Sequence, residues 1–344
     1  MSEIRVAIMG FGGMAAQHKD AYDHLLADGR GIRLVAICDK NPSCLETVST
    51  TNLGTVTHGG FDGISFYTDP DLMLASERID AVDICLPTFL HKEYAVRFLR
   101  AGKHVLCEKP MALSFADCAE MVRAANECNR QLMVGQCLRF DPSYLYLKSL
   151  VDSGELGAVR RVRMGRLSYM PAWGGWFADT AKSGGAIFDF HVHDLDMLRF
   201  IFGEPESVSS VAYAPSDGWQ YVSTRLFYDG MITEAEASFD ESPTTPFSMW
   251  YRARFDRATV LFDTDRITVY PDSGEAYEPV VKYADRIAAE IAYFADVIRG
   301  KAVNTQNPPT STALSIKLAE TVRESTLDGG RVKPFACSNL MKNH

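Results

Sequence analysis

A glycine-rich turn near the N-terminus constrains the fold more than any other segment of the chain. The turn is Gly10-Phe11-Gly12-Gly13-Met14-Ala15; it follows an apolar run at residues 4–8 and opens a helical pattern at 13–28. In this context the first glycine allows a tight turn, the second lets a pyrophosphate approach the backbone, and Ala15 allows close helix–strand packing. The N–H groups that begin the helix then face an anion. The turn therefore predicts a dinucleotide site at all six residues, with a purely structural turn as the alternative.

The first 135 residues alternate short apolar, β-branched runs with stretches of helical periodicity. The runs lie at 4–8, 33–37, 81–85, 104–107 and 131–134, and the helical stretches include 13–28, 90–101 and 114–129. Strands that are apolar on both faces are typical of a parallel sheet with helices on both sides. This pattern indicates an α/β fold, with a doubly wound, parallel Rossmann domain at residues 1–137.

Beyond Phe140-Asp141-Pro142 the chain changes to strand-like segments separated by short turns. These segments lie at 158–169, 206–213, 220–228, 231–239, 247–255, 258–263 and 266–270, and one helical insert interrupts them at 186–202. The pattern predicts an α+β domain with a large, mainly antiparallel open sheet, which we place at residues 138–309. Two helices close the chain, at about 281–299 and 310–327.

Composition limits the class of protein. The chain has 344 residues, 47% of them hydrophobic, and a formal net charge of −9. It has enough apolar material for two domain cores, and its acidity disfavours nucleic acid and anionic membranes as partners. We find no signal peptide and no apolar run of the ~20 residues that span a membrane. None of the eight cysteines forms a C-x-x-C pair, so we expect a reduced, cytoplasmic protein.

The second strand ends in Cys38-Asp39-Lys40. An acidic residue at this point can accept hydrogen bonds from both ribose hydroxyls and repel a 2′-phosphate, so Asp39 favours NAD over NADP. The neighbouring Lys40 could still tolerate NADP. A solvated aspartate at the strand end is the alternative.

Two later strand ends carry further candidates, Leu86-Pro87-Thr88-Phe89-Leu90-His91 and Cys107-Glu108-Lys109-Pro110. Ligands of open α/β sheets bind beyond the carboxyl ends of the strands, so both segments should face the cofactor. A lysine in a partly desolvated cleft could hydrogen-bond a substrate hydroxyl and assist proton transfer. A solvated Glu108–Lys109 pair is the alternative.

A segment rich in histidine and aspartate follows a glycine pair at residues 184–185. If the segment is helical, Asp189 and His193 share one face, because a spacing of four residues returns to the same side. Histidine is the side chain suited to proton exchange near neutral pH. His191 would point off this face unless a turn brings it back toward a substrate. Metal ligation by His191, His193 and Asp194 is an alternative that we do not favour, and a core role for His193 is another.

These motifs together resemble the Gfo/Idh/MocA oxidoreductases, the family of glucose–fructose oxidoreductase and inositol dehydrogenase. The matching segments occur in order along nearly the whole chain: G-F-G-G-M-A (10–15), Asp39, L-P-T-F-L-H (86–91), C-E-K-P (107–110), L-R-F-D-P (138–142), S-G-G-A-I-F-D-F-H-V-H-D-L-D (183–196) and A-E-T-V-R-E-S (319–325). The combination of E-K-P with the later histidine motif is the most specific part of the resemblance.

The resemblance implies that Lys109, Asp189 and His193 form a catalytic group. His193 would be the general acid/base, Lys109 would polarise the reacting oxygen and Asp189 would orient the substrate. The implied reaction is NAD(P)-dependent hydride transfer to or from a hydroxyl or ketone of a sugar, polyol or cyclitol. Some similar proteins instead use NAD transiently to cleave glycosides, and others are non-catalytic regulators. The presence of Lys109, Asp189 and His193 together counts against a regulator.

The cofactor site that we expect extends beyond the glycine turn. Its other members are Asp39, Lys40, Leu86, Pro87, Thr88, His91, Glu108, Lys109, Gln136 and Arg139. A hinge between domains is the alternative role for Arg139. For the substrate we add Trp176 and His191 to the catalytic group, because aromatic residues such as Trp173, Trp176 and Phe177 could stack on a sugar ring or simply pack a loop.

The resemblance also bears on assembly. It implies that the last helix returns to the first domain and that the antiparallel sheet joins subunits into a homodimer or homotetramer. Four arginines on one strand-like segment, Arg160, Arg161, Arg163 and Arg166, would be divided between the two sheet faces by strand alternation. A solvated or interface role therefore suits them better than nucleic-acid binding.

Overall fold

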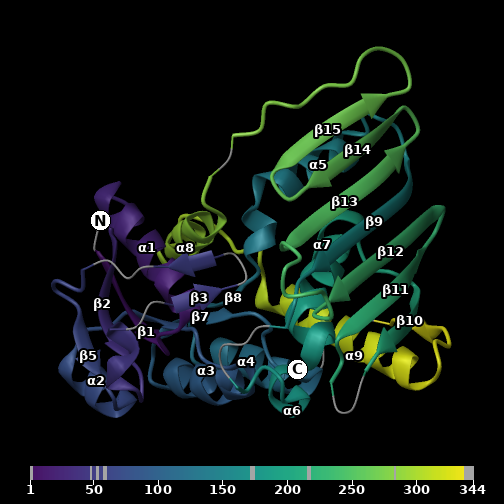
Figure 1. Cartoon of the computed structure of the whole chain (residues 1–344). Helices are drawn as coiled ribbons and strands as arrows, with labels where there is room; N and C mark the ends of the chain where they lie inside the picture. Colours follow the sequence, from purple (N-terminus) through teal and green to yellow (C-terminus); the bar gives the residue numbers. More distant parts are fainter. Residues whose placement is uncertain are drawn as a thin grey trace.

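The computed structural model describes residues 3–46, 49–51, 54–56, 60–170, 175–214, 218–282 and 284–336. Two large sheets organise these residues, one in each half of the molecule, with helices packed on and between them (Figure 1). Within these ranges no helix is both long enough and apolar enough to cross a membrane.

The N-terminal half is built on a six-stranded sheet in the order β5-β2-β1-β6-β7-β8, and every pair in it is parallel. The strands are β1 (Ile4–Met9), β2 (Ile32–Cys38), β5 (Ser65–Tyr67), β6 (Ala81–Ile84), β7 (His104–Glu108) and β8 (Leu132–Gly135). The helices that connect them are α1 (Gly13–Ala27), α2 (Pro70–Ser76), α3 (His91–Arg100) and α4 (Phe115–Glu127). The predicted doubly wound parallel sheet is confirmed.

Both faces of this sheet are buried because alternate residues of each strand enter different cores. On one face Ala7 and Val82 pack with α3 and α4. On the other face Val6 and Ile8 pack with α1 and with α8 (Arg286–Ile298). Short one-turn helices and a hairpin complete this half: η1 (Pro42–Leu45), η2 (Thr88–Leu90), η3 (Cys137–Phe140), β3 (Ser49–Thr51) and β4 (Gly54–Val56).

The C-terminal half is built on an eight-stranded sheet in the order β15-β14-β13-β9-β12-β11-β10-β16. Its strands are β9 (Val159–Leu167), β10 (Ser207–Tyr213), β11 (Tyr221–Tyr228), β12 (Met231–Ser238), β13 (Ser248–Phe255), β14 (Ala258–Asp263), β15 (Arg266–Pro271) and β16 (Lys333–Pro334). The pair β9–β12 is parallel, and the other neighbours are antiparallel. The predicted large, mainly antiparallel sheet is confirmed.

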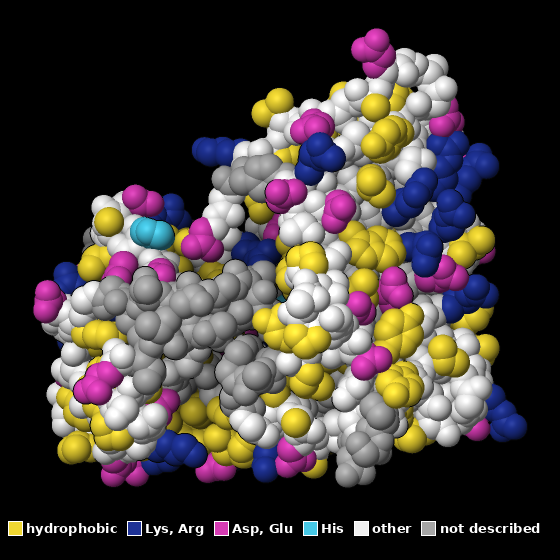
Figure 2. All heavy atoms as spheres, in the orientation of Figure 1, with side chains coloured by type: hydrophobic (Ala, Val, Ile, Leu, Met, Phe, Trp, Pro, Cys, Tyr) yellow, Lys and Arg dark blue, Asp and Glu magenta, His cyan; other side chains and the backbone are white. Residues whose placement is uncertain are grey.

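One face of this second sheet is covered by α5 (Pro142–Ser153), α7 (Val192–Phe202) and α9 (Pro309–Leu327). Strand alternation decides which side chains meet them: Val162 and Met164 of β9 are buried, whereas Arg161 and Arg163 are exposed. Arg166 lies on the buried side, so the basic cluster is divided between the faces as expected. Figure 2 shows Lys and Arg side chains interspersed with Asp and Glu over the sheet.

The two closing helices pack differently from each other. The sequence analysis assigns α8 to the second domain, but in the structure Ile287, Ile291 and Phe294 pack on α1 and its sheet, because the apolar stripe of α8 faces that way. Helix α9 lies between the halves, against α4 on one side and against β10 and α7 on the other.

The helical insert predicted at 186–202 is two elements rather than one, and a short helix, α6 (Thr180–Ser183), precedes them. A π-helix, η4 (Ala186–His191), precedes α7. Gly184 and Gly185 introduce it with φ of +76° and +62°. A Cβ on Gly185 would lie 2.9 Å from Trp219, and one on Gly184 would collide with Phe188, so both positions require glycine.

Candidate active site

Gly10 begins the glycine turn, where the ends of β1, β2 and β6 meet. Its φ is +86°, and its N–H donates to the Cys38 carbonyl oxygen over 2.8 Å. A Cβ at this position would lie 2.8 Å from a Leu86 methyl carbon and 3.0 Å from the Cys85 carbonyl oxygen. The turn can therefore pass over β6 only with glycine at position 10.

Gly12 is the N-cap of α1 and has a different environment. No heavy atom lies within 4 Å of the place that a Cβ would occupy. No side chain caps the helix, and its first turn carries no acidic residue. The start of α1 thus offers backbone N–H groups, an open approach and the positive end of the helix dipole, which fits the pyrophosphate of a dinucleotide.

Asp39 lies beside this turn at the end of β2. One carboxylate oxygen accepts the Phe11 N–H over 2.8 Å and the other accepts the Asn41 N–H over 2.8 Å. A carboxylate offers about four lone-pair sites, so two bonds leave capacity for ribose hydroxyls. Asp39 is partly exposed and Lys40 is exposed.

The segment after β6 contributes less to an open site than the sequence analysis expects. Leu86 and Pro87 are partly exposed, but Thr88 and His91 are buried. The His91 ring nitrogens lie 2.8 Å from the Pro110 carbonyl oxygen and 2.7 Å from that of Leu86. Burial lowers the pKa of this histidine. His91 therefore ties the two strand-end loops together rather than facing a ligand.

Lys109 and Asp189 meet across the two halves of the molecule. The Lys109 ammonium donates to an Asp189 carboxylate oxygen over 3.0 Å and to the Asp189 carbonyl oxygen over 2.9 Å. Lys109 lies just beyond β7, and Asp189 lies in η4. Their side chains are 16% and 9% exposed, so the pair is largely desolvated but open on one side.

His193 lies in the first turn of α7, close to this pair. Its Nδ1 atom is buried without a hydrogen-bond partner, and the whole residue is 8% exposed. Burial, together with the positive charges of Lys109, Arg166 and Arg286, holds the pKa of His193 well below its usual value. The structure therefore brings together the three residues that the sequence analysis groups as catalytic.

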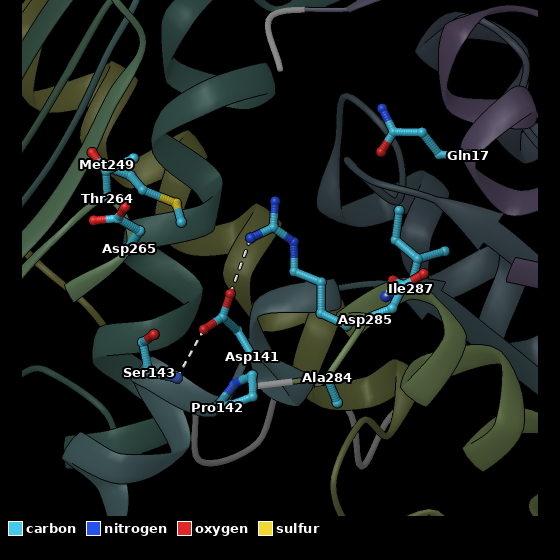
Figure 3. Close-up of a pocket in the computed structure, with 11 residues that line it drawn as sticks. Gln17, Asp141, Pro142, Ser143, Met249, Thr264, Asp265, Ala284, Asp285 and Ile287 are labelled. Atoms are coloured by element: carbon cyan, nitrogen blue, oxygen red, sulfur yellow. Dashed lines mark hydrogen bonds and ion pairs between the residues drawn. The ribbon is translucent and has the colours of Figure 1, made fainter. Parts of the chain in front are cut away.

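Two of the cations near His193 are held by buried carboxylates, a role that the sequence did not predict for either carboxylate. Arg166 lies 3.4 Å from Asp194, whose pKa burial raises to about 6. Arg286 lies 3.0 Å from Asp141. Figure 3 shows Asp141 between Met249 and Thr264 on one side and Gln17 and Ile287 on the other.

A cavity of about 520 Å³ lies at this boundary. Gln17 of α1 lines it from the first half, and Met249 of β13 with Thr264 lines it from the second. Met249 also contacts the Arg166 guanidinium through its sulfur, at 3.6 Å. The cavity is thus linked to the surroundings of His193 through Arg166 and Arg286, and most of the residues that line it have polar side chains.

Two expected site residues are instead structural. The Arg139 guanidinium is 1% exposed and donates to both carboxylate oxygens of Asp196, at 2.8 and 2.7 Å. It also donates to Ser311 and to the Gln306 carbonyl oxygen, so it joins η3 to α7 and α9 rather than contacting a cofactor. His191 is fully buried, with Nε2 2.9 Å from the Thr224 hydroxyl; its ring packs on β11 and does not face a substrate.

The remaining expected contacts differ in accessibility. Gln136 follows β8 and is 1% exposed, and its side-chain nitrogen is buried without a partner, so it offers one donor. Trp176 is partly buried and packs against Phe177, with ring centroids 4.3 Å apart and ring planes tilted by 39°. Trp173 lies outside the described residues.

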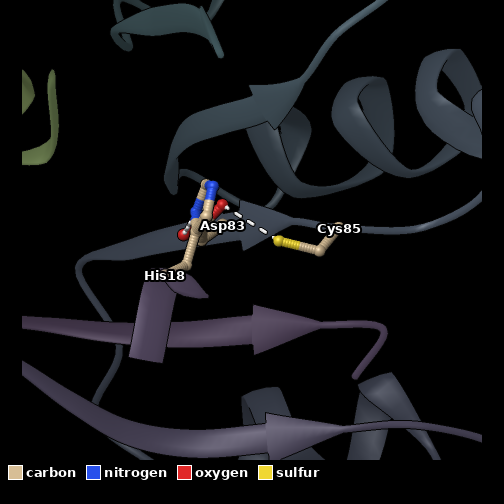
Figure 4. Close-up of side chains that lie close together, drawn as sticks. All are labelled: His18, Asp83 and Cys85. Carbon is tan, nitrogen blue, oxygen red and sulfur yellow. Dashed lines mark hydrogen bonds and ion pairs between the residues drawn. The ribbon is translucent and has the colours of Figure 1, made fainter. Parts of the chain in front are cut away.

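Glu108 belongs to a buried cluster that the sequence analysis does not anticipate. Its carboxylate is bound by His18 from α1 and by the Lys109 N–H, so it lies beneath the strand-end loop instead of facing the cofactor. His18 also contacts Asp83 of β6, beside Cys85 (Figure 4). The one available signal was the spacing of His18 from Ala15 and Tyr22, which puts all three on the buried face of α1.

A comparison with family models matches both halves of the chain. A model described as "Oxidoreductase family, NAD-binding Rossmann fold" matches residues 4–136. A second model, described as "GFO/IDH/MocA C-terminal domain", matches residues 144–269.

Curated proteins similar to the chain carry names of different reactions. Inositol 2-dehydrogenase of Rhizobium meliloti is 33% identical over 212 residues, covering 61% of this chain and 58% of that protein. 2,7-Anhydro-N-acetylneuraminate hydratase of Mediterraneibacter gnavus is 32% identical over 213 residues, covering 61% of this chain and 52% of that protein. The matched stretch therefore spans a little over half the length of these relatives.

A solved structure shares the fold over almost the whole chain. An oxidoreductase from Agrobacterium radiobacter, in complex with NAD+, L-tartaric acid and magnesium, superposes with a TM-score of 0.81. It is 21% identical and covers 97% of this chain and 99% of its own.

The contrast between the two turn glycines yields a test of the dinucleotide site. We expect Gly12→Ala to raise the Kd for NAD by roughly tenfold or more, because its methyl group would occupy the open approach to α1 and weaken charge-assisted hydrogen bonds. Its Tm should fall by no more than about 3 °C. Gly10→Ala, the matched control, should lose stability through backbone strain and the contacts with Leu86 and Cys85.

Fluorescence titration and thermal unfolding measure these two effects separately. Equal NAD affinity in wild type and in the Gly12 variant would contradict the assignment of the site.

Proposed function

The chain belongs to the Gfo/Idh/MocA oxidoreductase family, and we propose that it is an NAD(P)-dependent dehydrogenase or reductase that acts on CH–OH groups of a sugar, polyol or cyclitol. The observation that carries this proposal is the Lys109–Asp189 contact at 3.0 Å beside His193. It lies at the carboxyl edge of the six-stranded sheet, where the glycine turn also lies. The similarity to an inositol 2-dehydrogenase supports the substrate class.

In the proposed reaction each of the three residues has one task. The Lys109 ammonium has three N–H donors and uses two of them on Asp189, which leaves one for a substrate oxygen. Its charge stabilises negative charge that develops on this oxygen during oxidation. Asp189 holds the ammonium in place and can accept a second substrate hydroxyl.

His193 moves the proton. Its lowered pKa means that the ring is neutral at pH 7 and can take the hydroxyl proton in the oxidation direction. Because Nδ1 is buried, we propose Nε2 as the atom that accepts it. Bound NAD supplies the hydride acceptor; Gly10, Gly12 and Asp39 would hold it, and Gln136 offers one further donor.

The space for the substrate is proposed from the cavity beside Arg286. A polar lining that contains amide, hydroxyl, guanidinium and carboxylate groups suits a ligand with several hydroxyls. The cavity volume of about 520 Å³ lies within the range of small-molecule sites.

NAD is the proposed preferred cofactor, with NADP tolerated through Lys40. The position of Asp39 against the glycine turn supports this preference, because a 2′-phosphate beside its carboxylate would bring two negative charges together.

We also propose a homo-oligomer that associates through the open face of the eight-stranded sheet. That face carries partly exposed Trp250 and the ion pair of Arg163 with Glu234, and the helices of the described residues pack on the opposite face. Light scattering of the purified protein would show a monomer if this is wrong.

A cytoplasmic location is proposed from the absence of disulfides among the seven cysteines in the described part of the chain, and cell fractionation tests it.

One relative is a hydratase. The decisive measurement is therefore whether substrate conversion accumulates reduced cofactor, as in a dehydrogenase, or leaves the cofactor unchanged. We expect a screen of polyols, inositols and sugars with NAD and NADP to find a substrate that accumulates reduced cofactor. Lys109→Ala and His193→Ala should lower kcat by about 10²- to 10⁴-fold, because each removes a group that acts on the transferred proton or the reacting oxygen.

The Kd for NAD should change little in both variants, and Lys148→Ala, on the exposed side of α5, serves as the control. Conversion without net reduced cofactor would point to transient use of NAD. Near wild-type turnover in either variant would contradict the catalytic assignment.

The environment of His193 predicts the pH dependence of oxidation. Because its pKa is below 6.5, the neutral base persists as the pH falls from 7, and kcat/KM for alcohol oxidation should decline only below pH 6.5. Asp194, with a pKa of about 6, titrates in the same range, so the profile of Asp194→Asn distinguishes the two groups. An acid limb centred above pH 6.5 would show that His193 is not the base.

Replacing Asp39 tests the cofactor preference. Asp39→Ala should reduce the ratio of kcat/KM with NAD to that with NADP by roughly 10- to 100-fold. The substitution removes the hydrogen bonds to the ribose hydroxyls of NAD and also the repulsion of the 2′-phosphate of NADP. Asp39→Asn keeps an oxygen for the Phe11 N–H while removing the charge, so it separates support of the turn from discrimination. An unchanged ratio in both variants would exclude Asp39 as the ribose contact.

A further inference from the structure

His18 occupies a fully buried position between two carboxylates from different strands. Its Nδ1 lies 2.8 Å from an Asp83 oxygen and its Nε2 lies 2.9 Å from a Glu108 oxygen, and the ring has no exposed surface. Tyr22, one turn further along α1, donates its hydroxyl to the same Asp83 oxygen over 2.9 Å. Figure 4 shows the His18 ring beside Asp83, with a dashed contact between Asp83 and Cys85.

The hydrogen-bond pattern sets the protonation of this group. Carboxylate oxygens accept hydrogen bonds, so a histidine that bonds to one through each nitrogen carries a proton on both. Burial alone would lower the pKa of His18, but Asp83 and Cys85 together raise it well above its usual value. Burial would raise the pKa of Glu108, but His18 and Lys109 keep it lowered. His18 is thus an imidazolium and Glu108 a carboxylate.

The second oxygen of Glu108 reaches the catalytic lysine. Glu108 Oε2 accepts the backbone N–H of Lys109 over 3.0 Å, while Oε1 accepts from His18. The carboxylate lies against Gly135 of β8: a Cβ there would be 2.8 Å from Oε1. The glycine thus leaves room for the carboxylate, and both of its oxygens are committed.

A metal site is a poor explanation of this cluster. His18, Asp83 and Cys85 have ligand atoms close enough together for one ion. Both ring nitrogens of His18 are already bound to carboxylates, and the pKa of the Cys85 thiol is raised to about 12, mainly by burial, so it is protonated. The thiol lies 3.7 Å from Asp83 as a donor.

We infer that His18 is a positioning residue of the active site: it holds Glu108, which holds the backbone of Lys109, and so ties the dinucleotide helix α1 to the lysine that faces Asp189. The inference rests on the proposed function for the role of Lys109. His18 touches neither the reacting atoms nor Lys109 itself. It acts by restricting where the peptide at position 109 can lie. Because His18 belongs to α1, this restraint comes from the helix whose N-cap is Gly12.

Hydrogen–deuterium exchange tests the structural half of this inference without any substrate. The Lys109 N–H is the atom held by Glu108, so we follow the exchange of this single backbone amide by NMR. In His18→Gln and in Glu108→Gln, we expect this amide to exchange about tenfold faster, because a neutral amide cannot satisfy both partners as the ion pair does. Tyr22→Phe, the matched control, loses a bond to Asp83 alone and should leave the Lys109 amide unchanged.

Steady-state kinetics tests the functional half in the same variants. A small displacement of Lys109 should lower kcat by on the order of 10- to 100-fold in both the His18 and Glu108 variants. The Kd for NAD should remain within about threefold of wild type, and kcat in Tyr22→Phe within about twofold, even where its Tm falls.

Each failure has a distinct meaning. Unchanged exchange at Lys109 in a folded His18 or Glu108 variant overturns the inference, as does an equal kcat loss in Tyr22→Phe, which would indicate general destabilisation. Faster exchange with unchanged kcat also overturns it. If Lys109→Ala itself keeps full turnover, the proposed function fails instead, and the exchange result still decides whether His18 holds the peptide.

Discussion

The contact between Lys109 and Asp189 is the interaction on which the rest of the structure depends. It joins the end of a strand in one half of the molecule to a π-helix in the other, with the ammonium on both a carboxylate and a carbonyl oxygen. Neither half alone contains the site. The relative placement of the two sheets must therefore be held within fractions of an ångström, since catalytic geometry tolerates little displacement.

Buried ion pairs at the same boundary provide that placement. Arg139 donates to Asp196 and to segments that precede and begin α9, and Arg286 from α8 donates to Asp141 at the start of α5. Desolvation makes such pairs costly, and a well-packed apolar contact would often stabilise as much. Their directional hydrogen bonds, however, accept one arrangement of the partners, whereas an apolar contact can slide. The ion pairs thus add direction to an interface that also contains apolar contacts, since one hydrophobic cluster joins residues of both halves.

Local patterns predicted the fold and part of the site because they depend on neighbouring residues in the chain. The glycine turn, both strand sets and the segment containing Asp189 and His193 follow from spacing and from family resemblance. What sequence reasoning missed depends on tertiary contacts. Arg139 was expected at the cofactor, yet Asp196 lies 57 positions away along the chain and captures it. His191 was expected near the substrate, but the π-helix turns it toward Thr224. His18 carried little signal, since its partners come from two later strands.

The same tertiary contacts also set the electrostatics of the site. Three cations, Lys109, Arg166 and Arg286, act on His193, and each lowers its pKa further than burial alone. Positive surroundings keep the imidazole neutral and so ready to accept a proton. They also stabilise an alkoxide that forms as the hydroxyl proton leaves. The first effect keeps the base unprotonated but lowers its proton affinity, so it is the stabilised alkoxide that favours removal of a proton from a substrate hydroxyl. Lys109 and Arg286, which form ion pairs at the boundary between the halves, thus also act on the proposed base, and they link this interface to its chemistry.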